Sequence, residues 1–450
     1  MTPNSEIKPT NDILDYLIRD GLILTLSPDF PEPFTGSIGI QEGKIVFIQP
    51  KGSQVFMPPA KKIINARGFL VMPGLVNTHT HGAMTLFRGL ADDLPLKTWL
   101  EQFIFPAEIR FVNEDSVYWG TLLACAEMIL SGTTTFADGY FYMDEAAKAV
   151  DRSGMRAVVC QGILDFPIPG IPDPTQKLLV AGRFVETWEG FSPLIHTGIF
   201  CHSPYTCSSE TLRTVKALCR KKQVPFFIHA AETKEEVSLI QSREGKTPIH
   251  YLQALDLLDA QTIAVHAIHL DSSEIELLAQ TRTAVAHCPE SNMKLASGIT
   301  PVAEMLKKGV LVGLGTDGCA SNNDLDLFKE MDTAAKLEKV HYADPTVMDA
   351  RTTVRMATIE GAHVLSLEKT IGSLEVGKEA DIIFLELFRP HLIPCYNPFS
   401  MLVYAAGGAD VHSVMIAGNM VMEDRKILTF DINEVLEQVN RLSQLIISGY

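Results

Sequence analysis

The sequence lacks the features that mark secreted, membrane-spanning and nucleic-acid-binding proteins. None of its 450 residues lie in an uncharged apolar run as long as the ~20 residues that a membrane helix needs. Residues 1–11 are polar and contain no apolar signal segment. Only 38 Lys and Arg stand against 54 Asp and Glu, so the net charge is −16, and no Lys/Arg-rich run offers a local exception. We therefore expect a cytoplasmic protein that binds neither a membrane nor nucleic acid.

Cysteine is also scarce, and it is not arranged for metal or redox chemistry. The 8 cysteines include no C-x-x-C pair, and most lie inside apolar runs, so we expect buried free thiols rather than disulfides. Gly/Ser-rich linkers and low-complexity tracts are absent as well. With 46% hydrophobic and 20% charged residues, the chain has the composition of a globular protein of two or three domains.

What the sequence does contain is a regular rhythm of short apolar runs, each followed by a helical pattern. The runs are continuous rather than alternating, which is typical of parallel strands covered on both faces. Eight strand–helix pairs in series predict an α/β fold, a (β/α)8 barrel. The predicted strands are 69–76, 133–137, 157–160, 195–200, 225–228, 262–265, 283–286 and 310–314. The predicted helices are 118–130, 144–153, 175–188, 209–220, 234–257, 272–280, 301–308 and 324–338.

The two ends of the chain have a different pattern. Residues 13–66 show alternation and turn signals typical of an antiparallel meander, and residues 372–387 and 411–424 are similar in kind. We expect both ends to form one small β-sandwich domain beside the barrel. The predicted division is 1–70 for its N-terminal part, 71–370 for the barrel, and 371–450 for its C-terminal part with a terminal helix.

Histidine and acidic residues gather where the barrel strands end, which is where such barrels carry their functional groups. Seven of the 13 histidines lie at these positions. His79 and His81 are two apart in an extended segment, so they point to one face, where His229 and Asp317 would also converge. Three imidazoles and one carboxylate suit one divalent metal, with Zn²⁺ the expected ion and Fe, Ni or Mn left open. A structural role remains the alternative, above all for His269 and His287.

Asp317 and two residues close to this group could carry out the chemistry of a hydrolytic reaction in which a bound water is the nucleophile. A metal lowers the pKa of its water toward ~7, and Asp317 could accept the proton as well as hold the metal. Glu232, three residues after His229, could protonate a leaving group, although it could also be a solvated glutamate at a helix start. His266, at the end of the sixth strand, could polarise or hydrogen-bond the attacked centre.

Two other kinds of site are less compatible with the sequence. A second metal is not expected, because segment 199–204 at the end of the fourth strand contains no lysine that could bridge two ions. Residues 313–318 match the G-x-G-x-x-G pattern of dinucleotide-binding proteins. However, that match places the carboxylate of Asp317 where a pyrophosphate would lie, so we do not expect a dinucleotide cofactor.

Several motifs taken together resemble the amidohydrolase superfamily. They are Pro73-Gly-Leu-Val-Asn-Thr-His-Thr-His81, His202-Ser-Pro-Tyr, His229-Ala-Ala-Glu232, His287-Cys-Pro-Glu-Ser-Asn, Gly315-Thr-Asp-Gly318 and Gly372-Ser-Leu-Glu-Val-Gly-Lys-Glu-Ala-Asp381. Phe87-Arg-Gly, Trp99-Leu and Phe105-Pro-Ala-Glu108 are most similar to the methylthioadenosine/S-adenosylhomocysteine deaminase family. This resemblance implies a barrel with a small β domain, and hydrolytic loss of ammonia from a purine ring.

The resemblance also implies roles for individual residues. It assigns His79, His81, His229 and Asp317 to the metal, and Asp317 also to the water's proton. It assigns Glu232 and His266 to proton handling at the attacked ring. Substrate binding is implied for Glu108, which would hold the ribose, and for His202, Glu232 and Trp99. One departure concerns the amino-acid tail of some substrates, because 162–176 contains no arginine, and Lys177 and Arg183 are the nearest cations.

The sequence thus predicts a metal-dependent hydrolase that removes ammonia from a small molecule, an adenine nucleoside or thionucleoside. Two alternatives stay open. The ring could be a guanine derivative, a pterin or an s-triazine, or the barrel could be catalytically silent, as loss of a metal ligand would indicate. All four predicted ligands are present. The sequence also leaves open whether the chain forms a homo-oligomer.

Overall fold

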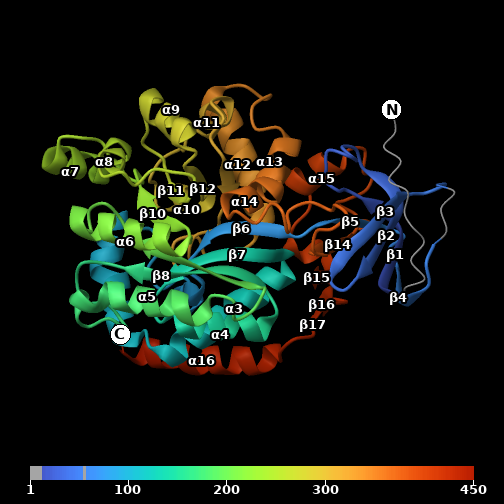
Figure 1. Ribbon diagram of the computed structural model, residues 1–450, viewed down its shortest axis with the longest axis horizontal. Coiled ribbons are helices and arrows are strands. Elements are labelled where there is room, and N and C mark those ends of the chain that lie inside the picture. The colour runs from blue at the N-terminus through green and yellow to red at the C-terminus, as the bar shows by residue number, and fades with distance from the viewer. Residues whose placement is uncertain (1–12, 54–56, 450) are drawn as a thin grey trace.

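The computed structural model describes residues 13–53 and 57–449, which form one sheet surrounded by helices and a second sheet beside it (Figure 1). The polar segment 1–11, on which the expectation about a signal peptide depended, lies outside the described residues. Among the described helices, none has both the length and the apolar character needed to cross a membrane.

One sheet is a barrel of eight parallel strands in chain order, which confirms the predicted (β/α)8 fold. Nearly all of its residues are buried, because side chains fill the interior and helices cover the outside. The barrel closes between its first and last strands, where Thr80 pairs with Asp317 and the Asp317 N–H donates to the His79 carbonyl at 3.0 Å. The strands are β6 (Leu75–Thr80), β7 (Thr133–Tyr140), β8 (Arg156–Ile163), β9 (Ile195–Cys201), β10 (Phe226–Ala230), β11 (Thr262–His266), β12 (Ala284–His287) and β13 (Val312–Leu314).

The long helices between these strands match the predicted ones, with one correction. The segment predicted as a single helix, 234–257, is two helices, because Gly245 ends the first in a left-handed conformation (φ +69°) and Pro248 begins the second. The helices are α3 (Glu114–Leu130), α4 (Met143–Ser153), α5 (Lys177–Trp188), α6 (Ser209–Lys222), α7 (Lys234–Glu244), α8 (Pro248–Ala254), α9 (Ser272–Thr281), α11 (Val302–Lys307) and α12 (Leu327–Tyr342).

Shorter helices occupy the connections, and several of them form the wall above the barrel. Between β6 and α3 the chain makes η1 (Gly82–Phe87), α1 (Leu96–Trp99), η2 (Leu100–Ile104) and α2 (Phe105–Phe111). Elsewhere lie η3 (Pro174–Gln176), α10 (Pro289–Lys294), α13 (Ala350–Met356), α14 (Ile359–Val364), α15 (Pro398–Tyr404) and η4 (Gly408–Asp410).

The second sheet is built from both ends of the chain, as expected, and its nine strands are joined in one hydrogen-bonded sheet. The expected antiparallel meander is only partly right. β1, β2 and β3 pair antiparallel, but β4 and β5 return alongside β1 in the parallel direction after the β2–β3 hairpin. The strands are β1 (Leu14–Ile23), β2 (Phe34–Gln41), β3 (Lys44–Pro50), β4 (Ala60–Asn65), β5 (Phe69–Pro73), β14 (Ile382–Glu386), β15 (Val411–Ile416), β16 (Asn419–Glu423) and β17 (Lys426–Ile427).

The passage between the two sheets lies at Gly74. The predicted first barrel strand, 69–76, is therefore wrong, because its first half is β5 in the small sheet and only its end belongs to β6. An apolar run does not reveal which sheet it joins, and here a glycine separates the two. A Cβ at Gly74 would lie 2.1 Å from the Thr134 hydroxyl oxygen. The chain therefore enters the barrel a few residues after the predicted division at 70/71.

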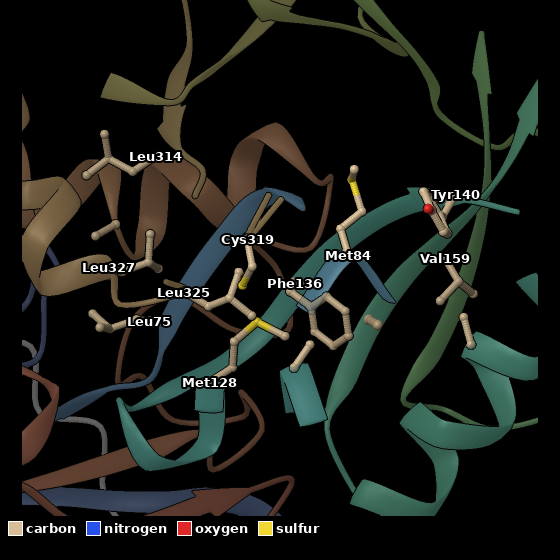
Figure 2. Close-up of a cluster of buried hydrophobic side chains, with 14 of the residues drawn as sticks. Leu75, Met84, Met128, Phe136, Tyr140, Val159, Leu314, Cys319, Leu325 and Leu327 are labelled. Atoms are coloured by element: carbon tan, nitrogen blue, oxygen red, sulfur yellow. The ribbon is translucent and has the colours of Figure 1, made fainter. Parts of the chain in front are cut away.

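The terminal helix α16 (Ile432–Gly449) is present, but it packs on the barrel rather than on the small sheet. It lies beneath α3 and α4 in Figure 1, and Arg441 binds Asp115 of α3 at 2.6 Å. Figure 2 shows part of the barrel's own core, where Met128 of α3, Phe136 of β7 and Leu325 gather. All eight cysteines of the chain are free, and all except Cys395 are buried.

Candidate active site

Four side chains meet at the carboxyl ends of the barrel strands and form a candidate metal site. His79 and His81 come from β6, His229 from β10, and Asp317 follows β13, so the barrel closure itself brings the last carboxylate to the first strand. One ligand atom from each of the four lies within 4.8 Å of the others. The Nε2 atoms of His79 and His81 are 3.2 and 3.3 Å from Asp317 Oδ1.

The imidazoles are held with one nitrogen facing the group. Nδ1 of His81 donates to the Gly139 carbonyl at 2.5 Å, and Nδ1 of His229 donates to the His202 carbonyl at 2.8 Å. Because a carbonyl oxygen only accepts, each Nδ1 is the donor, and each ring is oriented with its Nε2 available to a ligand. Nε2 of His79 is buried without a hydrogen-bonding partner of suitable geometry. Burial lowers the pKa of His79 to about 4, so its ring is in the neutral form that metals bind.

The carboxylate of Asp317 is oriented from the opposite side. Burial alone would raise its pKa, but the neighbouring imidazoles of His79 and His81 hold the pKa well below its usual value. Its Oδ2 atom accepts hydrogen bonds from the hydroxyls of Ser291 at 2.7 Å and Ser321 at 2.9 Å. Oδ1 is thereby left toward the imidazoles. Three imidazole nitrogens and one carboxylate oxygen, all close together, fit a divalent metal with one open position.

His266 lies beside this group, and its ring orientation is also determined by a neighbour. Its Nδ1 lies 2.8 Å from the side-chain oxygen of Asn292, so Nδ1 donates to that oxygen. Its Nε2 is 3.9 Å from a carboxyl oxygen of Glu232. His266 and Asp317 both have left-handed backbones, with φ of +69° and +61°. Such strain in non-glycine residues is typical of functional sites.

Glu232 is held in place through its backbone. The N–H groups of Ala231 and Glu232 donate to the two carboxyl oxygens of Glu236 at 2.9 and 2.8 Å. Thr233 caps α7 by accepting from the Glu236 N–H at 3.1 Å. In the usual capping box the glutamate would bond back to the capping residue, whereas here it clamps the preceding turn. Burial raises the pKa of the Glu232 carboxyl above its ordinary value.

A cavity of about 790 Å³, partly open to solvent, extends from the metal donors, and the predicted substrate residues line it. Glu108 lies in helix α2, and its Oε1 accepts from the Tyr140 hydroxyl at 2.7 Å. Burial raises the pKa of Glu108 to about 7 and lowers that of His202 to about 3. Trp99 is buried in the wall. The remaining predicted residues on the lining are His81, His229, Glu232, His266 and Asp317.

Other residues considered from the sequence lie outside the described part of this lining. His269 donates from Nε2 to the Ser297 carbonyl at 2.7 Å, which is a structural role. His287 is buried, and neither of its ring nitrogens has a hydrogen-bonding partner among the residues that the structure describes. Lys177 binds Asp165 at 2.7 Å, and Arg183 is exposed on α5.

The sequence did not reveal the residues that orient the candidate catalytic groups. Ser291 and Asn292 lie in the motif that begins at His287, but no periodicity assigns them a partner. Glu236 had a detectable signal, the Thr-x-x-Glu pattern of 233–236 at a helix start. Ser321 and Tyr140 carried none.

Comparison with known proteins gives close and nearly full-length similarities. A model of the amidohydrolase family matches residues 70–421. A 5-methylthioadenosine/S-adenosylhomocysteine deaminase of Syntrophobacter fumaroxidans is 47% identical over 432 residues, covering 96% of this chain and 98% of the relative. A 5′-deoxyadenosine deaminase of Methanosarcina mazei is 44% identical over 435 residues, covering 96% and 99%. Among solved structures, an adenosine deaminase from Xanthomonas campestris with bound zinc has a TM-score of 0.94 at 37% identity, covering 97% of this chain and 99% of the other.

Proposed function

The chain belongs to the amidohydrolase family, and from this premise we propose that it is a metal-dependent deaminase of adenine nucleosides and 5′-thionucleosides. In the reaction, water adds to the ring carbon that bears the amino group, ammonia leaves, and an oxopurine nucleoside forms. The observation that carries the proposal is the convergence of four metal donors with Glu232 and His266 at one end of a cavity. The names of relatives at 44–47% identity support the adenine ring.

We propose one Zn²⁺ per chain, held by His79, His81, His229 and Asp317. Buried nitrogen and oxygen donors suit zinc, and the similar adenosine deaminase contains it. When bound, the metal would supply a Lewis acid that lowers the pKa of water.

The protein's own groups would manage the protons. Asp317 is ionised and has one oxygen free of the two serine hydroxyls, so it can accept the proton of the attacking water. Glu232, whose pKa is raised by burial, can deliver a proton to the ring or to the leaving amino group. His266 presents its Nε2 beside Glu232 and can orient the attacked centre.

The cavity lining suggests how the nucleoside is positioned. Glu108 lies along the lining and offers a carboxyl group that can pair with the ribose hydroxyls. His202 and Trp99 also line the cavity and would contact the substrate.

Two measurements test the proposed function. Elemental analysis should find about one divalent metal per chain and little in the His79→Ala/His81→Ala double variant. Two metals per chain, or an unaltered content in the variant, would contradict the assigned ligands. Ammonia release should then occur with adenosine, 5′-deoxyadenosine or methylthioadenosine. If ammonia is released only from guanine, a pterin or an s-triazine, the substrate is not an adenine nucleoside. If ammonia is released from none of these compounds, the barrel is catalytically silent.

A further inference from the structure

Away from the metal donors, much of the wall of the cavity is apolar. The short helices after β6 contribute Leu96, Trp99, Leu100, Ile104 and Phe105, and the segment after β8 contributes Leu164. Phe166 packs edge-on against Phe105 with ring centroids 6.1 Å apart, and it is 39% exposed, so it stands where this wall meets solvent.

No lysine or arginine belongs to the cavity lining within the part of the chain that the structure describes. Three of the cations carried by nearby segments are paired with an acid, whereas Arg110 of α2 donates to the Gly449 carbonyl and Arg183 of α5 is exposed. Lys97 of α1 lies 4.0 Å from Glu101, and Lys177 lies 2.7 Å from Asp165. Lys294, next to the lining residue Leu295, binds Asp92 at 2.6 Å.

The only acidic or basic side chains on the described lining, histidines apart, are three carboxyl groups, Glu108, Glu232 and Asp317. A substrate that brought its own carboxylate into this cavity would lose hydration without gaining a cationic partner. Burying an unpaired charge is among the most unfavourable changes in a binding site. An uncharged tail would instead exchange water for apolar contacts.

We propose that the cavity selects adenine nucleosides whose 5′ substituent is uncharged and apolar, such as a methyl or alkylthio group, and discriminates against tails that carry a carboxylate. The inference rests on the proposed deaminase function and narrows its substrate class. Substrates with a carboxylate tail would be poor because the described cavity wall lacks a positive charge, and not because the tail is long.

A matched pair of substrates separates charge from size. One is 5′-deoxyadenosine carrying a 3-carboxypropylthio group at C5′, and the other is its primary amide, with the same number of heavy atoms. We expect kcat/KM for the amide to exceed that for the acid by at least about 10-fold. S-adenosylhomocysteine should be poorer than methylthioadenosine by a similar factor. Equal kcat/KM for the acid and the amide would overturn the inference.

The controls keep failures distinguishable. If neither long-tailed compound reacts while methylthioadenosine does, the selection is by length, and the charge inference is wrong. If no adenine nucleoside reacts, both the proposed function and this inference are wrong. A deaminase that treats acid and amide alike leaves the proposed function standing and overturns only the selection.

A pair of variants at the mouth tests the electrostatic cause. Phe166→Arg adds a cation at a half-exposed position, and Phe166→Gln is the uncharged control. We expect the amide-to-acid ratio of kcat/KM to narrow several-fold in the arginine variant alone. A ratio that stays unchanged in the arginine variant, or narrows equally in both, would assign the discrimination to something other than charge.

Discussion

At the residue scale, a substitution at Glu232 can distinguish a role in proton transfer from a role in metal binding. Glu232 is close to the metal donors without being one of them, and burial raises its pKa so that it can hold a proton for transfer. Glu232→Gln should keep the metal and lose kcat by ~10²-fold or more, as expected for loss of general acid–base help. Steady-state kinetics and elemental analysis on one preparation check this. Glu235→Gln, at an exposed position on α7, is the matched control. A change confined to KM would make Glu232 a binding residue only.

Asn292 is the residue whose role depends most on geometry. Its side-chain oxygen is the acceptor for Nδ1 of His266, so Asn292→Ala should let the ring rotate or change tautomer. We expect kcat to fall about 10- to 100-fold, with KM changed less. Asn292→Asp retains an acceptor oxygen and should recover much of the loss. Equal losses in the two variants would contradict positioning through the hydrogen bond and indicate a packing role.

Glu108 provides a test of ribose recognition. Hydrogen bonds to charged groups contribute ~1.5–3 kcal/mol, so Glu108→Ala should lower kcat/KM for adenosine by roughly 10- to 150-fold. With 2′,3′-dideoxyadenosine the wild type should already show a comparable loss, and the mutation should add little. Kinetics of both proteins with both nucleosides check the prediction. Equal effects of the mutation on the two substrates would remove the ribose role.

Most residues of the candidate site were predictable from the sequence, and the reason is topological. Parallel barrel strands all end at one rim, so His79, His229 and Asp317, which are far apart in the chain, had to lie near one another. The residues that orient them were not predictable. Ser291 and Asn292 act through particular distances and ring orientations, which no spacing in the sequence encodes.

At the scale of single elements, Glu338 of α12 links its helix to α11. It is buried and accepts from the Ala303 N–H at 2.8 Å, and burial raises its pKa to about 7 from an ordinary 4.5. Between these two pKa values the folded state holds more protons than the unfolded state, so Glu338 makes the protein less stable as pH rises.

Glu338→Gln removes this titration, so the wild type should lose stability relative to the variant between pH 4.5 and 8. The pKa shift of Glu338 can change the free energy of unfolding by at most about 3 kcal/mol over this pH range, since one pKa unit is 1.36 kcal/mol. Melting temperatures of both proteins at pH 5 and pH 8 measure the effect. Glu235→Gln, an exposed change, serves as the control. A constant difference between wild type and Glu338→Gln across this range would show that the carboxyl does not titrate there.

The elements themselves were predicted best where the pattern depends on burial. Barrel strands are buried on both faces, so they appear as apolar runs with a regular period. The predictions were wrong where a single glycine divides one apolar segment into two elements. Gly245 divides the helix predicted over 234–257, and Gly74 divides the strand predicted over 69–76 between two sheets. Neither division changes the apolar content of its segment, so periodicity alone could not detect it.

At the scale of the whole molecule, one arginine joins the barrel to the small sheet. Arg156 begins β8 at the end of the barrel opposite the active site, and its side chain is 0% exposed. It binds Glu379 at 2.6 Å and Asp381 at 3.0 Å, and Asp381 also accepts from the Ala417 N–H at 2.8 Å. The carbonyl of Asp381 receives the N–H of Gly74, where the chain passes between the sheets. The two sheets therefore share a buried, charged junction.

Removing the cation from this junction should destabilise the folded protein without changing the rate of the reaction it catalyses. Arg156→Ala leaves two carboxylates that are partly or fully buried and unpaired, and breaking a buried pair in this way costs about 3–5 kcal/mol. We expect a melting temperature lower by several degrees, with kcat at 25 °C close to that of the wild type. The control is Arg441→Ala, which removes a half-exposed pair with Asp115 and should cost at most about 1 kcal/mol. If Arg156→Ala melts like the wild type, the junction does not hold the sheets together. If it loses kcat while keeping its melting temperature, Arg156 acts on the site and not on the assembly of the two sheets.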